Sequence, residues 1–174
     1  MRDHLPWLCQ GDIFSSVPVA DFTLTDANEV EVSLPIGPAV LLTHDCAMDK
    51  PTKTGVPRVE RLQFVRLRSI DGLPLQQQQT LRGGRMSVAP FEAMHIGDVS
   101  RLGESFILLS DPYYLPAGYF TLKFDDYSNY PDIEPDARYV TPQAHDTRVG
   151  RLDEAQLDLL RLKMLAFWAR VQPD

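Results

Sequence analysis

Alternation of apolar and polar residues is the dominant pattern in the first 70 residues. It predicts two short strands, at 22–25 and 30–34, that pair as a β-hairpin across the turn between them. An apolar run at 39–42 follows a Gly-Pro turn and predicts a buried strand. Alternation resumes at 62–68, with apolar residues on one face and arginines on the other. These patterns together predict a sheet of short strands.

The second half of the chain continues this pattern. Apolar runs predict further strands at 105–109 and 119–124, separated by a turn-rich segment at 111–116. The glutamine tract at 76–79 fits either a loop or a short helix, and the sequence leaves both open. Many short strands between Pro and Gly turns indicate a mainly β fold, a small β-barrel.

The last segment predicts a helix that is apolar on two sides. Asp153 and Gln156 have the spacing of a capping box at its start. At 100° per residue one face carries Leu157, Leu160, Met164, Phe167, Trp168 and Val171, and the other carries Leu159, Leu162, Leu165 and Ala166. We expect the first face to cover the barrel. The second would contact the N-terminal arm or a partner, which is either another protein or a second copy of the chain.

Composition favours one domain without membrane or extensive nucleic-acid contact. The chain has 174 residues, 44% of them hydrophobic, and a formal net charge of −7, which disfavours binding to phosphate backbones. We predict an arm at 1–9, a barrel with inserted loops at 10–149 and the helix at 150–174. An N-terminus without a signal-peptide pattern and two cysteines, expected as free thiols, indicate a cytoplasmic protein.

Reactive side chains follow the predicted buried strand at 39–42. They are Thr43, His44, Asp45, Cys46 and Asp49. His44, Asp45 and Cys46 are the candidate catalytic groups, as a thiolate nucleophile with a base or as a hydrolytic centre. A metal site would need a second ligand cluster, which the spacings do not supply, so we predict neither metal nor cofactor. The structural alternative is that these residues only cap a turn.

Other charged residues have a candidate role or a plain structural one. Arginines in the middle of the chain are candidate anion-binding residues beside this loop: Arg58, Arg61, Arg66 and Arg68. Asp12 is interpreted as a turn or strand-entry residue whose carboxylate accepts from nearby backbone N–H groups. We expect His4, His95 and His145 to be exposed to solvent.

Two segments give a resemblance to a known family. Gly11-Asp12-Ile13 opening a first strand, followed by a hairpin and the central strand 38–43, resembles the PemK/MazF-like family of SH3-like barrels. The resemblance implies an SH3-like barrel that dimerises and cleaves RNA without a metal. The arginine of the family's Arg-Pro pair takes part in cleavage, but this chain has Gly37 before Pro38. Thr43–Cys46 and the terminal helix are also similar to poorly characterised bacterial proteins in which a strand leads into a Cys-containing turn.

Two hypotheses of function follow. The first is a non-enzymatic binding or regulatory module that acts through protein–protein contacts, with the loop after residue 42 and its arginines as a recognition surface. The alternative is a diverged toxin-like ribonuclease or another hydrolase that uses His44, Asp45 or Cys46.

Overall fold

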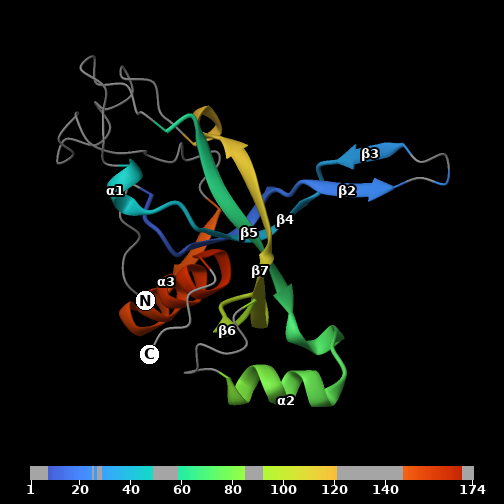
Figure 1. The fold of residues 1–174 in the computed structure, drawn as a ribbon, viewed down its shortest axis with the longest axis vertical. Helices are drawn as coiled ribbons and strands as arrows, with labels where there is room; N and C mark the ends of the chain where they lie inside the picture. The colour runs from blue at the N-terminus through green and yellow to red at the C-terminus, as the bar shows by residue number, and fades with distance from the viewer. Residues whose placement is uncertain are drawn as a thin grey trace.

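A curled antiparallel sheet forms the body of the protein (Figure 1). The computed structural model describes residues 8–24, 26, 29–48, 59–84, 92–120 and 147–169. The sheet has six strands in the order β6-β7-β5-β4-β1-β8 and curls into a half-barrel, which together with a C-terminal helix confirms the mainly β, barrel-like fold class. The strands are β1 (Asp12–Pro18), β2 (Asp21–Leu24), β3 (Val30–Ser33), β4 (Ile36–Leu41), β5 (Arg61–Ser69), β6 (Ala93–Val99), β7 (Gly103–Pro116) and β8 (Arg148–Arg151). The helices are α1 (Asp45–Met48), α2 (Leu75–Gly83) and α3 (Glu154–Ala169), with 3-10 turns η1 (Ile70–Gly72) and η2 (Ala117–Tyr119).

Strand alternation places a core on each face of the sheet. In β5, Leu62 and Phe64 belong to the core on one face, and Val65 and Leu67 belong to the core on the other. On the first face the rings of Phe64 and Phe120 stack with centroids 5.2 Å apart. Both faces of this central strand are therefore buried, which explains why the sheet needs a covering helix as well as its own curl.

α3 covers the second face. Leu159 and Leu160 are buried in that core, and Met164 and Phe167 pack against it. The predicted capping box is confirmed, because Gln156 N donates to Asp153 Oδ1 at 2.8 Å and Asp153 N donates to Gln156 Oε1 at 3.0 Å. Burial lowers the pKa of Lys163, on the same helix, to about 8.

A glycine lets α3 approach the start of the sheet. Gly11 has φ of +84°, a left-handed conformation that glycine adopts readily. A Cβ atom at this position would lie 2.6 Å from Leu157 Cδ2. The backbone of Gly11 also makes two hydrogen bonds: its N–H donates to Leu41 O in β4, and its carbonyl accepts from Leu152 N just before α3. The absence of a side chain therefore allows β4 and the start of α3 to meet here.

Several sequence predictions differ from the structure. The turn-rich segment at 111–116 is part of the long strand β7, which has a bulge where it pairs with β5 and so accommodates Pro112. The strand predicted at 119–124 is wrong in its described part, because η2 occupies Ala117–Tyr119, and residues 121–124 lie outside the described ones. The glutamine tract is the helix α2.

His95 is the clearest correction among the polar residues. It lies in β6 with only 6% of its surface exposed, contrary to the expected exposure, because β6 pairs with β7 in the sheet and is covered by α2 on one face and by α3 on the other. Its Nε2 lies 2.8 Å from Glu104 Oε1. Glu104 also accepts two hydrogen bonds from Arg82, which lower its pKa to about 2. This network ties α2 to the edge of the sheet.

Asp12 is more deeply embedded than a strand-entry residue needs to be. Its Oδ2 accepts from Cys9 N at 2.9 Å, as the sequence interpretation expected, but the residue is completely buried and also pairs with β8. Arg151 Nε donates to Oδ1 at 2.6 Å, and Arg148 Nη1 lies 3.5 Å from Oδ2. Burial raises the pKa of Asp12, and these donors oppose that rise.

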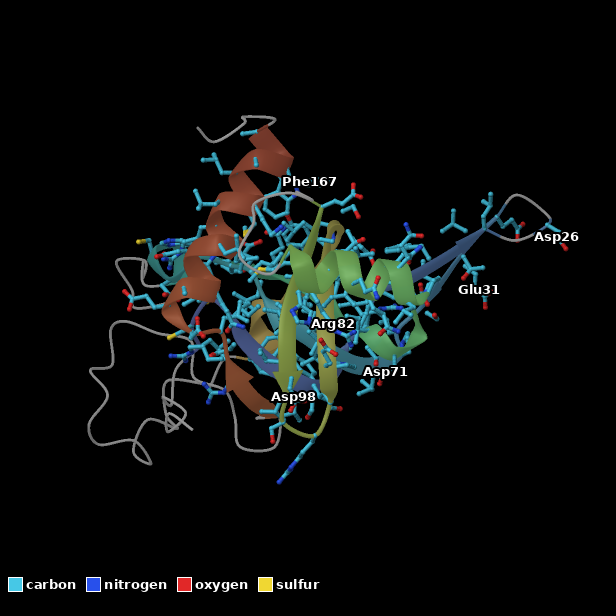
Figure 2. All side chains as sticks on the ribbon, turned by 90° about the horizontal axis from the view of Figure 1, so that it is seen from below. Asp26, Glu31, Asp71, Arg82, Asp98 and Phe167 are labelled. Atoms are coloured by element: carbon cyan, nitrogen blue, oxygen red, sulfur yellow. The ribbon has the colours of Figure 1, made fainter. Side chains whose placement is uncertain are left out.

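One hairpin leaves the body of the molecule. β2 and β3 pair only with each other and project beyond the sheet, with Asp26 at the tip (Figures 1 and 2). β1 and β4 continue into them, and Val19 N donates to Pro35 O where the two pairs join. Residues 12–24 and 29–41 therefore form one long two-stranded ribbon whose near half lies in the sheet and whose far half does not.

Candidate binding pocket

A pocket of about 380 Å³ opens where the packing of α3 on the sheet ends. On β5 the residues that continue the face of Val65 and Leu67 are Gln63 and Arg61, so polar side chains replace apolar ones along one strand face. Tyr114 lies directly across from Gln63 on β7. The lining consists of Gln10, Leu42, Thr43, His44, Arg61, Gln63, Tyr114, Arg161 and Met164.

The loop after β4 forms one wall and is held by hydrogen bonds to backbone. Thr43 Oγ1 accepts from Gln63 N at 2.7 Å, and Asp45 Oδ1 accepts from Gln10 N at 2.6 Å. His44 Nδ1 accepts from Cys46 N at 3.1 Å. These three side chains fix the loop in the manner of the turn-capping alternative, and two of them, Thr43 and His44, also line the pocket.

The geometry offers little to a thiol nucleophile. Cys46 is exposed, and His44 contacts its backbone amide, while within the described residues no hydrogen bond joins the imidazole to Cys46 Sγ. Asp49 and Arg58 lie outside the described residues. The part of the chain that the structure describes also contains no group of three or more His, Cys, Asp or Glu side chains that could hold a metal ion.

The candidate arginines separate into one pocket residue and two ion-paired ones. Arg61 lines the pocket. Arg66 Nη2 lies 3.6 Å from Asp21 Oδ2, and Arg68 Nη2 donates to Asp111 Oδ2 at 2.7 Å. The alternation along β5 predicts that Arg66 and Arg68 face solvent. In the structure each of these two arginines pairs with a carboxylate from another strand.

The sequence interpretation missed most of the opposite wall. Gln10, Arg161 and Met164 come from the N-terminal turn and α3, far from the loop in sequence, and Tyr114 lies in a segment interpreted as a turn. Gln10 is the only one with a signal of its own, because it precedes Gly11 at the strand entry. The others gain meaning only once α3 is placed on the sheet.

The predicted interface on α3 is divided by the fold. Leu159 and Ala166 are buried within the chain, whereas Leu162 and Leu165 are 42% and 53% exposed. Trp168, assigned by periodicity to the other face, is also exposed. The apolar surface left on α3 is therefore narrower than the pattern indicated.

Comparisons with known proteins give no relative for this chain. No protein-family model matches the sequence, and no curated protein matches it significantly. None of the helices within the described ranges is long and apolar enough to cross a membrane. The functional argument therefore depends on the geometry alone.

Proposed function

We propose that this protein is a non-enzymatic binding module that acts through protein–protein contacts, with the β2–β3 hairpin as its docking surface. The observation that carries the proposal is the apolar face of that hairpin. Phe22 is opposite Val32 and Leu24 is opposite Val30, so all four side chains lie on one face, and each is at least 56% exposed. The other face carries Asp21, Thr23, Glu31 and Ser33.

Such a face is unusual on a chain without a partner. A two-stranded hairpin is marginally stable in water unless it packs against something, and contiguous exposed apolar patches mark interaction sites. Leu34 and Ile36 extend the exposed apolar surface toward the sheet. We propose that a second copy of the chain covers this apolar face, because the same hairpin on both copies would give a symmetric contact.

The experiment measures molar mass by light scattering over a range of protein concentrations. Phe22→Ser combined with Val32→Thr should shift the chain from dimer to monomer. Leu75→Ser is the matched control, because Leu75 on α2 is equally exposed, at 66%, but isolated from the hairpin. A wild-type chain that is monomeric throughout, with binding of an apolar dye unchanged by the double variant, would contradict the proposal.

The hydrolase alternative has less support from the arrangement of His44. Because Nδ1 accepts a hydrogen bond from Cys46 N, the neutral imidazole carries its proton on Nε2. An Nε2–H group donates a hydrogen bond and cannot take a proton as a general base. The resemblance to PemK/MazF-like barrels remains a proposal about the fold, and we infer no RNA cleavage from it.

A further inference from the structure

We propose that the pocket between α3 and the loop after β4 binds a small organic anion, a carboxylate or phosphate attached to a planar ring. The proposal is separate from the hairpin and starts from charge. Two guanidinium groups, of Arg61 and Arg161, and the imidazole of His44 line the pocket, and no lining residue within the described ranges is acidic. In a chain with a net charge of −7, this is a local reversal of sign.

Arg161 is held in place for this role. Its Nε donates to Gln10 Oε1 at 3.0 Å, and the Gln10 side chain is itself buried and donates to Leu42 O at 2.9 Å. The Arg161 side chain is 41% exposed, and its Nη1 lies 3.3 Å from the exposed Asp158. With Nε and Nη1 engaged by Gln10 and Asp158, Nη2 makes no hydrogen bond within the described ranges, and its two N–H groups are left to donate to a carboxylate or phosphate oxygen.

Arg61 supplies a second cation on the sheet side. Within the described ranges six other arginines each face a carboxylate: Arg66, Arg68, Arg82, Arg148, Arg151 and Arg161. Arg61 has no ion pair with any residue in those ranges, although it lies on a strand that supplies two of those six. An arginine at the edge of a pocket that has no ion pair within the described ranges is available to a ligand, and an anion that pairs with it breaks no ion pair that those ranges show.

His44 adds a neutral donor to the two charges. The hydrogen bond from Cys46 N to Nδ1 fixes the tautomer of the neutral ring, so Nε2, which has no partner among the described residues, carries the proton. Thr43 is already used by Gln63 N. The polar groups left for a ligand are therefore mostly donors, which is the arrangement that an acceptor-only group such as a carboxylate requires.

The apolar residues that line the pocket favour a ligand that carries a planar ring as well as an anionic group. Tyr114 is 57% exposed, and Leu42 and Met164 line the same pocket. A bare inorganic ion would leave these groups in contact with water, whereas a planar ring can stack on the tyrosine and contact the thioether. The volume of about 380 Å³ is within the range of small-molecule sites.

Titration calorimetry at low salt tests the proposal with matched probes. AMP is compared with adenosine and inorganic phosphate, and N-acetyltryptophan is compared with its amide and acetate. We expect at least one ring-bearing anion to bind about tenfold more tightly than both its neutral and its ringless counterpart, because a charge-assisted hydrogen bond is worth more than the 1.4 kcal/mol that tenfold represents. A difference in the AMP series identifies the anionic group of the ligand as a phosphate, and a difference in the N-acetyltryptophan series identifies it as a carboxylate.

Variants link this binding to the pocket. Arg61→Ala and Arg161→Ala should each weaken the preferred probe about tenfold or more. Arg101→Ala is the control, because Arg101 is an exposed arginine in the turn between β6 and β7 and lies outside the pocket lining. No binding by either anion, equal binding of the neutral or ringless compounds, or binding unaffected by Arg61→Ala would overturn the proposal.

Discussion

The two halves of the ribbon formed by residues 12–24 and 29–41 each contain a strand with a phenylalanine, and the two phenylalanines have opposite surroundings. In the near half, Phe14 of β1 is completely buried and its ring packs edge-on against Phe64 and Phe120. In the far half, Phe22 of β2 is 66% exposed. β2 alternates apolar and polar residues, whereas in β1 two apolar residues, Ile13 and Phe14, are followed by two serines. Alternation in β2 determines which side chains share a face, and it does not determine whether anything covers that face.

The largest expected contrast lies between these two phenylalanines. Phe14→Ala should lower the free energy of unfolding by about 4 kcal/mol, because truncating a fully buried ring loses its contacts and leaves a cavity. Phe22→Ala should change it by less than about 0.5 kcal/mol in a dilute, unassociated sample. Urea denaturation of the two variants measures both values, and similar losses would mean that the chain itself covers the hairpin.

A second contrast uses carboxylates. Asp12→Asn should cost about 3 kcal/mol, because the new amide N–H₂ group would face only donors, from Cys9 N and the two arginines, in a buried position. Glu31→Gln, on the polar face of the exposed hairpin, should cost less than about 0.5 kcal/mol.

Thermal and urea unfolding of the two carboxylate variants give the comparison. If Asp12→Asn proves as mild as Glu31→Gln, the buried pairs with β8 contribute little to stability. The two ends of the ribbon would then differ in packing alone.

The smallest effect is expected at the junction of the two halves. Arg66 and Asp21 form a half-exposed ion pair that joins β5 to the base of the hairpin. Asp21→Asn should lower global stability by no more than about 0.5 kcal/mol, but it should speed hydrogen exchange of the amides in β2 and β3 relative to those in β1. Asp111→Asn breaks the Arg68 pair elsewhere on the sheet and is the control. Unchanged exchange in Asp21→Asn would show that this pair does not hold the hairpin.

Local patterns were enough for much of the fold. The hairpin, the central strands near 39–42 and 62–68 and the capping box at Asp153 are all present, because alternation and capping depend on neighbours in the sequence. β7 was misread at Pro112, since a bulge created by its pairing with β5 decides whether proline is tolerated there. β6 was missed for a similar reason. Its seven residues include His95 and Gly97, and the cover given by α2 on one face and α3 on the other makes them a buried strand.

The pocket was less predictable than the fold. Thr43, His44 and Arg61 were found because they adjoin predicted strands. Arg161 and Tyr114 were not, since each is an ordinary surface residue until α3 crosses the end of β5. Charge on Arg66 and Arg68 gave no way to distinguish them from Arg61, because the carboxylates that pair with them come from distant parts of the chain.

The continuous ribbon has a mechanical consequence. Its far end is the exposed hairpin (Figure 1), while at its near end Gln10 precedes β1 and Leu42 follows β4. Both of these residues line the pocket. Two paired strands embedded in a sheet resist stretching along their length, so a force applied to the hairpin tip is transmitted along the strands into the sheet. The tip of the hairpin and the pocket end of β1 and β4 therefore belong to one continuous pair of hydrogen-bonded strands.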